Sequence, residues 1–342
     1  MEIKELLLRE IGKFKNNKII FSNYHVSTDN MNKHNQPIFY SKKGNLYEKT
    51  NILMSNIRPY FNKVWYSDRT GSKSSNVLCF VVTNNNVLSK YAYYLICSDK
   101  FNNFWSKTSK GTTMPVGDKE AILNFKFKIC DKATQQKIIN IIEPFENLKN
   151  KINNKLHYLK DITLICINNF NLNKKFSLNN FVNFQGFSFK SNDFMPNNGK
   201  YIIYKISNIT NSKQNTSYTN NLISSCLLRE GDVVTGLSGT IGTSDVILEN
   251  DKFLLNQRLL AIKTNYPLLI KLIIENNKNI LEKKSTGSVQ MNITKNDVLN
   301  IKYDSNLNNV FNNLISKLYI NYSKKILLIN NAIKLLIDLY IF

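Results

Sequence analysis

The sequence predicts an α+β protein in which two tandem domains are joined by two long helices that form an antiparallel coiled coil. The first observation is a repeat: residues 123–127 (LNFKF) and 299–303 (LNIKY) read almost alike, and each follows a Ser-x-Gly loop and precedes a long helical segment. The second is that residues 51–84 align with residues 232–265. The third is an apolar spacing of three and four after each copy. Because solenoid repeats run only about 20 to 50 residues, these are two divergent copies of one domain.

Residues 1–130 are expected to form the first domain. Short β-type runs lie at 19–24, 77–82 and 125–129 between Asn-, Ser- and Gly-rich turns, whereas the pattern of residues 88–103 is helical. A mixture of this kind is typical of an α+β domain. The total length of 342 residues also suits two domains of ordinary size.

Residues 131–168 are expected to form the first long helix, which would act as a spacer. Apolar side chains recur there in steps of three and four, as in an amphipathic helix: Ile138, Ile141, Ile142, Phe145, Leu148, Ile152, Leu156, Leu159 and Ile162. Pro144 should kink this helix, because it removes a backbone donor.

Residues 169–304 repeat the domain and residues 305–342 repeat the helix. The second apolar stripe consists of Phe311, Ile315, Leu318, Tyr322, Ile326, Ile329, Ile333, Leu336 and Tyr340. Each helix alone would expose a long apolar face, so we expect the two stripes to pack against each other. A helix of about 35 residues is on the order of 50 Å long, which is enough to hold two domains about one turn of duplex, roughly 34 Å, apart.

The charge of the chain favours a polyanionic partner. The sequence contains 46 Lys and Arg against 24 Asp and Glu, a formal net charge of +22. Such a field attracts nucleic acid and releases its counterions. An A/T-rich genome would enrich Lys and Asn without any such role, but it would also be expected to raise Glu, and acidic residues are scarce here.

The cysteines and the hydropathy pattern predict a cytoplasmic protein without a membrane span. The five cysteines are scattered and form no Cys-x-x-Cys pair, which argues against structural zinc and suits reduced thiols. The start of the chain lacks the basic and apolar runs of a signal peptide. The most apolar stretch, 326–342, carries two Asn, a Lys and an Asp, unlike a span of about 20 apolar residues.

Several segments resemble the specificity subunit of type I restriction-modification enzymes. In the first half these are 51–60 (NILMSNIRPY), Gly71, 75–76 (SN), 109–115 (SKGTTMP) and 135–139 (QQKII). The second half shows a weaker version in 231–234 (GDVV), 238–242 (SGTIG), 256–258 (NQR) and 285–290 (STGSVQ). The resemblance covers nearly the whole chain.

The resemblance implies a DNA-recognition subunit. In that family each half carries a target-recognition domain that reads one part of a bipartite DNA sequence, and the conserved helices set the spacing and dock methyltransferase subunits. The implied partners are double-stranded DNA, two methyltransferase subunits and, through the complex, restriction subunits. The second helix departs from the pattern, because 308–310 (NNV) stand where Gln-Gln-Lys is found in the first.

No catalytic, cofactor or metal motif is expected. The Asn/Asp-Pro-Pro-Tyr/Phe of DNA-adenine methyltransferases is missing, and residues 231–238 have phosphate-loop glycine spacing but Leu237 in place of the lysine. Residues 282–284 (EKK) lack the Pro-Asp of a nuclease, and the three histidines have no partner at ligand spacing. We therefore expect a non-catalytic subunit without a cofactor. Two alternatives stay open: a protein that acts only through its coiled coil, and an RNA-binding protein that stacks unpaired bases on aromatic rings.

The candidate DNA contacts are polar and basic residues of the turn-rich stretches, because Arg and Lys suit guanine and phosphate while Asn and Gln suit adenine. In the first domain they are Arg58, Lys63, Arg69, Lys73, Lys107, Lys110, Thr112 and Thr113. In the second they are Lys205, Asn208, Lys213, Gln214, Ser238, Thr240, Arg258, Ser285, Ser288 and Gln290. We expect fewer than half of them to touch DNA.

Overall fold

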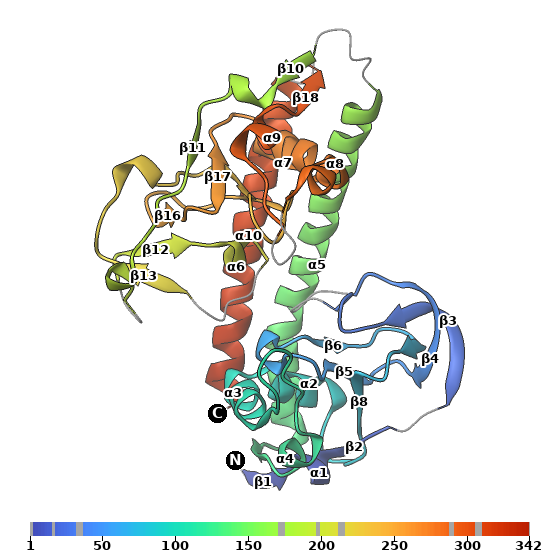
Figure 1. Ribbon diagram of the computed structural model, residues 1–342. Coiled ribbons are helices and arrows are strands. Elements are labelled where there is room, and N and C mark those ends of the chain that lie inside the picture. The colour runs from blue at the N-terminus through green and yellow to red at the C-terminus, as the bar shows by residue number, and fades with distance from the viewer. Residues whose placement is uncertain are drawn as a thin grey trace. The chain divides into compact units, whose positions relative to one another are not determined.

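The computed structural model describes residues 3–15, 18–31, 37–169, 175–195, 199–210, 216–286, 291–304 and 310–341. The chain forms two compact units, one of Met1–Asn150 with Leu328–Phe342 and one of Lys151–Leu327. Two long helices, α5 (Lys132–Asn169) and α10 (Val310–Ile341), each contribute one part to each unit (Figure 1). The α+β class and the two long helices are thus confirmed.

The described residues of the first unit form three small sheets. Strand β1 (Lys4–Leu7) pairs with β9 (Lys126–Ile129). A four-stranded sheet has the order β2 (Gly12–Phe14), β8 (Val77–Val82), β5 (Ile52–Ser55) and β6 (Val64–Tyr66). A closed three-stranded barrel consists of β3 (Ile19–Val26), β4 (Tyr40–Tyr47) and β7 (Gly71–Lys73). The helices are α1 (Leu8–Ile11), the 3-10 turn η1 (Pro59–Phe61), α2 (Ser89–Cys97), α3 (Asp99–Thr108) and α4 (Lys119–Leu123).

The second unit repeats this plan. Strand β10 (Lys175–Ser177) pairs with β18 (Lys302–Asp304), and the four-stranded sheet has the order β11 (Asn183–Gln185), β17 (Leu259–Ile262), β14 (Val233–Gly236) and β15 (Ser244–Val246). The third sheet has the order β13 (Ser217–Thr219), β12 (Tyr201–Tyr204) and β16 (Phe253–Leu255). The helices are η2 (Leu178–Asn180), η3 (Ser191–Asp193), α6 (Ile206–Ile209), η5 (Ser224–Cys226), α7 (Pro267–Asn276), α8 (Lys278–Lys284) and α9 (Lys295–Leu299).

Strand pairing fixes how the two copies correspond. Ser55 pairs with Val77 in the first unit, and Gly236 pairs with Leu259 in the second. Val77 therefore corresponds to Leu259, one residue later than the sequence alignment placed it. A backbone ladder decides this register, because a slip of one residue would turn every side chain of the strand to the opposite face.

The central strands form the cores because they are covered on both faces. All four residues of β5 and all four of β17 are buried, and their sequences, ILMS and LLAI, are apolar runs rather than alternating ones. Helix α2 contacts β6 and β8 of the first sheet (Figure 1). Helix α7 contacts β14 and β15 of the second, with its residues from Pro267 to Ile274 buried.

The long helices pair within each unit, and they run in opposite directions there (Figure 1). In the second unit the Lys155 ammonium lies 5.5 Å from the Tyr322 ring centroid, and Leu156 and Leu159 pack on the cluster that contains Ile315 and Tyr319. In the first unit α10 also contacts a shorter helix, because Lys334 forms a 2.6 Å ion pair with Asp99 of α3. The described residues contain no helix long and apolar enough to cross a membrane.

The buried face of α5 differs from the expected apolar stripe. Ile141, Phe145, Leu148 and Ile162 are 37–48% exposed, and Phe311 and Tyr340 of α10 are 49% and 43% exposed, so their assignment to the seam was wrong. Polar Gln135, Lys149 and Thr163 are buried instead. A stripe drawn through apolar residues alone merged two neighbouring faces of one helix. The helix also continues through Pro144 without interruption.

Candidate nucleic-acid interface

The loop that follows β5 in the first unit and the loop that follows β14 in the second make the same reversal. Its backbone is left-handed at Arg58 (φ 50°) and Asn62 (φ 47°) in the first unit, and at Gly239 (φ 76°) and Gly242 (φ 70°) in the second. Left-handed backbone costs a non-glycine residue about 1–2 kcal/mol. The first unit thus has Arg58 at a position where the second unit has Gly239, which adopts this backbone conformation without strain.

A second loop is hydrogen-bonded to this reversal. The Arg58 amide donates to the Pro115 carbonyl at 2.8 Å, and Val116 exchanges two backbone hydrogen bonds with Lys110 at 2.8 and 2.9 Å. Thr112 and Thr113 are exposed at the tip of this loop. The structure therefore brings four predicted residues to one edge of the first unit: Arg58, Lys110, Thr112 and Thr113.

The second unit repeats these connections. The Gly239 amide donates to the Met291 carbonyl at 3.0 Å, and Asn292 exchanges two backbone hydrogen bonds with Thr286 at 2.9 and 3.0 Å. Ser238 forms an isolated β-bridge with Asn292, as Ile57 does with Val116. One backbone scaffold is present twice and carries different side chains.

Lys63 joins two loops of the first unit. Its Nζ donates to the Thr28 carbonyl at 2.9 Å, and it lies 5.7 Å from the Phe61 ring centroid. Burial lowers the pKa of Lys63, nearby Asp29 opposes this, and the Arg58 cation adds to it. Lys63 is thus a partly buried connecting residue beside Arg58.

The second unit has a groove of about 340 Å³ beside the loop that corresponds to the Arg58 loop of the first unit. Its lining consists of Lys205, Ile206, Ser207, Ser238, Gly239, Thr240, Asn256 and Arg258. Asn208 stabilises the turn that begins at Lys205, because its Oδ1 accepts the Lys205 amide hydrogen at 2.7 Å. Four predicted residues line the groove and a fifth, Asn208, supports it.

Two hydroxyl groups in this groove are unsatisfied. Ser238 Oγ and Thr240 Oγ1 are buried without a hydrogen-bond partner among the described residues. Lys205 Nζ donates to Ser217 Oγ at 2.6 Å and lies 4.5 Å from the Phe194 ring centroid, and burial lowers its pKa. The groove therefore combines cationic side chains with hydroxyls whose bonds would be completed by a ligand or water.

Other predicted residues lie elsewhere. Lys73 is only 4% exposed and burial lowers its pKa, so its ammonium is not offered to a phosphate at the surface, and we drop it from the candidate contacts. Arg69 forms a 2.7 Å ion pair with Asp68, and its guanidinium lies 4.8–5.0 Å from the rings of Phe39 and Tyr24.

Lys107 is exposed near the end of α3, and Ser285 Oγ donates to the Glu282 carbonyl at the end of α8. The remaining candidates, Lys213, Gln214, Ser288 and Gln290, lie outside the described residues.

Sequence reasoning missed two polar residues at these loops. Asn256 lines the groove of the second unit. Asn76 is exposed and corresponds to Arg258 of the second unit. The two positions match because the Asn56 amide donates to the Asn76 carbonyl at 2.9 Å, as the Leu237 amide does to the Arg258 carbonyl at 3.0 Å. The NQR segment contained a signal for Asn256, whereas Asn76 could be matched to Arg258 only from the strand register.

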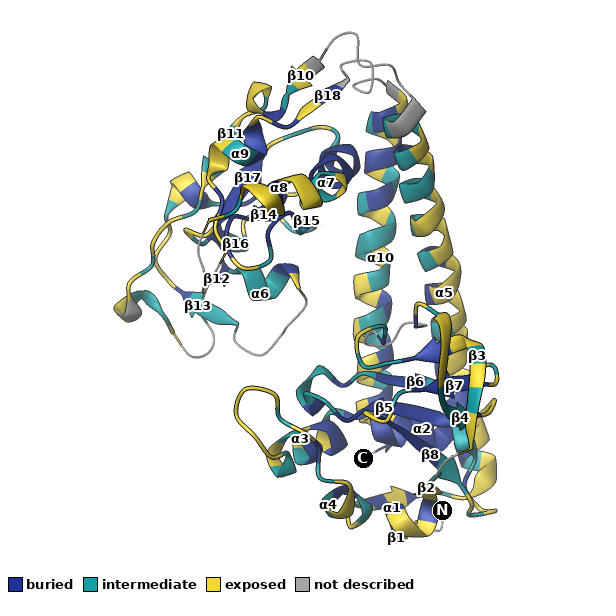
Figure 2. Ribbon diagram, turned by 45° about the vertical axis from the view of Figure 1, so that its right-hand side comes forward, coloured by how far each residue is buried: buried dark blue, intermediate teal, exposed yellow. Residues whose placement is uncertain are grey.

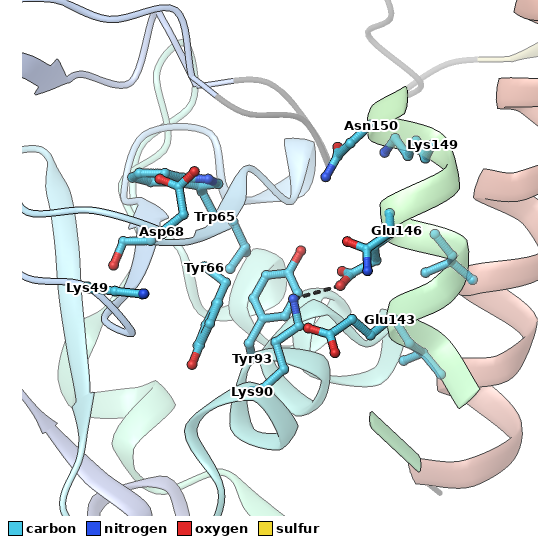
Figure 3. A pocket seen from close by; sticks show the side chains of 15 residues that line it. Lys49, Trp65, Tyr66, Asp68, Lys90, Tyr93, Glu143, Glu146, Lys149 and Asn150 are labelled. Atoms are coloured by element: carbon cyan, nitrogen blue, oxygen red, sulfur yellow. Dashed lines mark ion pairs between the residues drawn. The ribbon is translucent and has the colours of Figure 1, made fainter. Parts of the chain in front are cut away.

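A second hollow, of about 290 Å³, lies in the first unit beside α5 (Figure 3). Lys90 forms a 2.6 Å ion pair there with Glu146 and lies 4.9 and 5.1 Å from the ring centroids of Tyr66 and Tyr93. Glu143 also points into this hollow (Figure 3). The lining contains three carboxylates (Asp68, Glu143 and Glu146) beside three lysines (Lys49, Lys90 and Lys149), so its charges balance and suit a structural contact better than a DNA phosphate. Among the described residues, no group of three His, Cys, Asp or Glu could hold a metal ion.

Comparison with known proteins gives one family and several distant folds. Residues 2–158 match the family model of the type I restriction modification DNA specificity domain. No curated protein matches the sequence significantly. The crystal structure of the type I restriction-modification system S subunit from M. genitalium is 12% identical, with 99% of this chain and 94% of that chain covered and a TM-score of 0.49. That of the HsdS subunit from Thermoanaerobacter tengcongensis is 13% identical, with 99% and 96% covered and a TM-score of 0.37.

The family match confirms the resemblance that rested on the NILMSNIRPY and SKGTTMP segments. It supports DNA recognition. It lends no support to an RNA-binding protein or to a protein that acts through its coiled coil alone.

Proposed function

We propose that this chain, which belongs to the type I restriction-modification DNA specificity family through residues 2–158, is the sequence-specific DNA-recognition subunit of such a complex. Each domain would read one half of a bipartite site. The observation that carries this proposal is the loop scaffold found in both units with different side chains at matching positions, such as Arg58 and Gly239 or Asn76 and Arg258.

The division of labour follows from the chemistry of DNA. Lysine and arginine contacts to phosphate position a protein on the duplex, and contacts to base edges select sequence. With a net charge of +22 the chain is suited to the first task. The exposed side chains at the paired loops, Thr112 and Thr113 in the first unit among them, are suited to the second.

We further propose the domain boundaries 1–130 and 169–304, with residues 131–168 and 305–342 as helical spacers. Helix α5 is continuous over 38 residues and α10 over 32, which supports a spacer role. Because a rigid helix fixes the separation of its ends, its length would set the number of base pairs between the half-sites.

Methyltransferase subunits are the proposed protein partners, and restriction subunits would join through them. The long helices carry apolar residues that stay exposed in the first unit: Ile141, Phe145, Leu148, Leu328, Leu335 and Leu339. A second set is exposed in the other unit: Tyr158, Ile162, Ile165, Phe311 and Leu314. Figure 2 shows exposed residues along α5 in yellow. Exposed apolar surface is typical of interaction sites, and one set per unit supports two methyltransferase subunits. This complex would act in the cytoplasm.

The test is to express the chain with its methyltransferase subunits in a host without methylation and to map the methylated sites. We expect a bipartite motif with a fixed spacer. A single uninterrupted motif, or no methylation despite an assembled complex, would contradict the proposal. The purified chain alone is expected not to transfer methyl groups from labelled S-adenosylmethionine.

A further inference from the structure

We infer that the groove of the second unit binds a phosphate of the DNA backbone, and that the first unit lacks this subsite because Lys63 occupies the corresponding gap. The inference rests on the proposed function, since it takes DNA as the ligand. It adds that the ligand of this groove is a backbone phosphate and that the two domains differ in this contact.

The groove offers hydrogen-bond donors to an anion. Ser238 is 4% exposed, and its Oγ has no partner among the described residues. Thr240 Oγ1 is also buried without a partner among the described residues, and both residues line the groove together with Gly239 between them. Lys205 and Arg258 add positive charge to the lining, which contains no carboxylate among the described residues.

This chemistry favours phosphate over the other ligands that a groove of this size could hold. An apolar ligand would leave the two hydroxyls buried and unsatisfied, which costs free energy. Adenine and cytosine present a donor in the major groove and would need an acceptor, which only Asn256 and the hydroxyls could supply. A phosphate can accept hydrogen bonds from both hydroxyls and is attracted by the positive charge of the lining.

The first unit contains a turn at Ser27 that matches the turn at Lys205, but there the space between this turn and the Arg58 loop is bridged by Lys63. The Ser27 amide donates to Asn30 Oδ1 at 2.6 Å, as the Lys205 amide does to Asn208 Oδ1 at 2.7 Å. The two turns thus correspond. In the first unit Lys63 Nζ crosses to this turn and donates to the Thr28 carbonyl at 2.9 Å.

Thr243 stands at the position of Lys63 in the second unit. The Gly236 amide donates to the Thr243 carbonyl at 3.2 Å, as the Ser55 amide does to the Lys63 carbonyl at 3.0 Å. A threonine has no ammonium group with which to bridge the gap. The side chain at the matching position of the second unit therefore does not close the groove that is described there.

The test measures the binding of duplexes by the chain assembled with its methyltransferase subunits, over a range of salt concentrations. Arg258→Gln should weaken binding to the cognate duplex and to duplexes with one altered base pair by the same factor, and should reduce the salt slope by about 0.9, the value for one lost phosphate contact. Lys252→Gln removes a cation that lies outside the groove and pairs with Glu249 at 2.7 Å, and it serves as the control. Lys63→Gln should leave the slope unchanged.

A second measurement identifies the phosphate. Duplexes carrying one methylphosphonate, which lacks the backbone charge, are scanned through the second half-site. One position should weaken the wild type roughly tenfold, as expected for a charged hydrogen bond, and should have little further effect on Ser238→Ala/Thr240→Val. An altered base preference in Arg258→Gln with an unchanged slope would overturn the phosphate assignment in favour of guanine. Unchanged binding would overturn the subsite, whereas a wild type without any preferred duplex would overturn the proposed function itself.

Discussion

Arg58 has a strained, left-handed backbone conformation in the loop that carries the candidate DNA contacts. The second unit places Gly239 at the same left-handed position, where it costs nothing. Arg58 is held there by the hydrogen bond from its amide to Pro115, and its Nε is buried without a partner among the described residues. Backbone strain of this kind accumulates at binding sites. The arginine is thus better explained by a ligand than by stability.

Arg58→Gly should therefore separate stability from binding. We expect the free energy of unfolding to stay equal or to rise by about 1 kcal/mol, because the left-handed strain is removed. DNA affinity should fall, because a cation is lost beside the 110–116 loop. Thermal unfolding and duplex binding measure the two effects. Arg58→Ala is the control, since it loses the cation but keeps the strain, and equal destabilisation by both substitutions would contradict the explanation.

His25 should make the first unit sensitive to mild acid. Burial lowers its pKa from 6.5, with a smaller contribution from Lys42, and its Nδ1 lies 2.9 Å from Ser72 Oγ. The folded protein thus favours the neutral ring, so its contribution to stability is complete above pH 6.5 and is lost as the pH falls toward the folded pKa. We expect the Tm to decrease between pH 7.5 and 5.5, and to decrease less in His25→Gln. His157→Gln, at an exposed histidine, should keep the wild-type decrease. An unchanged decrease in His25→Gln would exclude this role.

At the scale of elements, periodicity predicted strands better than helix faces. The runs 77–82 and 125–129 correspond to β8 and β9, because short apolar stretches between turn residues fit a central strand. The helical stretch 88–103 consists of two helices, α2 and α3, because Ser98 accepts the Phe101 amide and begins a new one. Apolar spacing could not show that Gln135 would be buried.

Gln135 is buried because the fold satisfies its amide completely. It accepts from the Leu88 amide at 2.8 Å and donates to the Asn86 and Cys130 carbonyls at 2.8 Å each. These partners lie far from it in sequence or on the backbone, where no side-chain pattern could indicate them. Likewise, nothing in the sequence shows that a Cβ at Gly117 would lie 2.0 Å from Trp105 Nε1. Predicting the groove was harder still, since it depends on the register of β17 and on the short side chain of Thr243.

The pairing of the helices can be tested at Ile152, which is 7% exposed in the second unit. Ile152→Asp places an unpaired charge at a buried position and should reduce the free energy of unfolding by on the order of 3–5 kcal/mol. Ile165→Asp on the same helix is the matched control, because Ile165 is 57% exposed and should tolerate the carboxylate. Denaturant unfolding compares the two. Equal stabilities would show that the seam does not depend on Ile152.

At the scale of the whole molecule, two copies of one fold allow two independent readings of DNA. The units share their strand order and their loop scaffold. They differ in the residues that these loops present, with Arg58 and Lys63 in one and Gly239 and Thr243 in the other. A duplication of this kind lets each half change its target without altering the helices.

Replacing residues 171–303 with the matching segment of a relative should therefore change only one half of the methylated motif. The first domain would keep its own base contacts, and α5 and α10 would keep the spacing. Inserting four residues, about one helical turn, into α5 should instead leave both half-sites unchanged and alter the number of base pairs between them. Sequencing of methylated DNA from cells that express each variant with the methyltransferase subunits measures both outcomes. If the exchange altered both halves together, the two domains would be reading one composite surface rather than two independent ones.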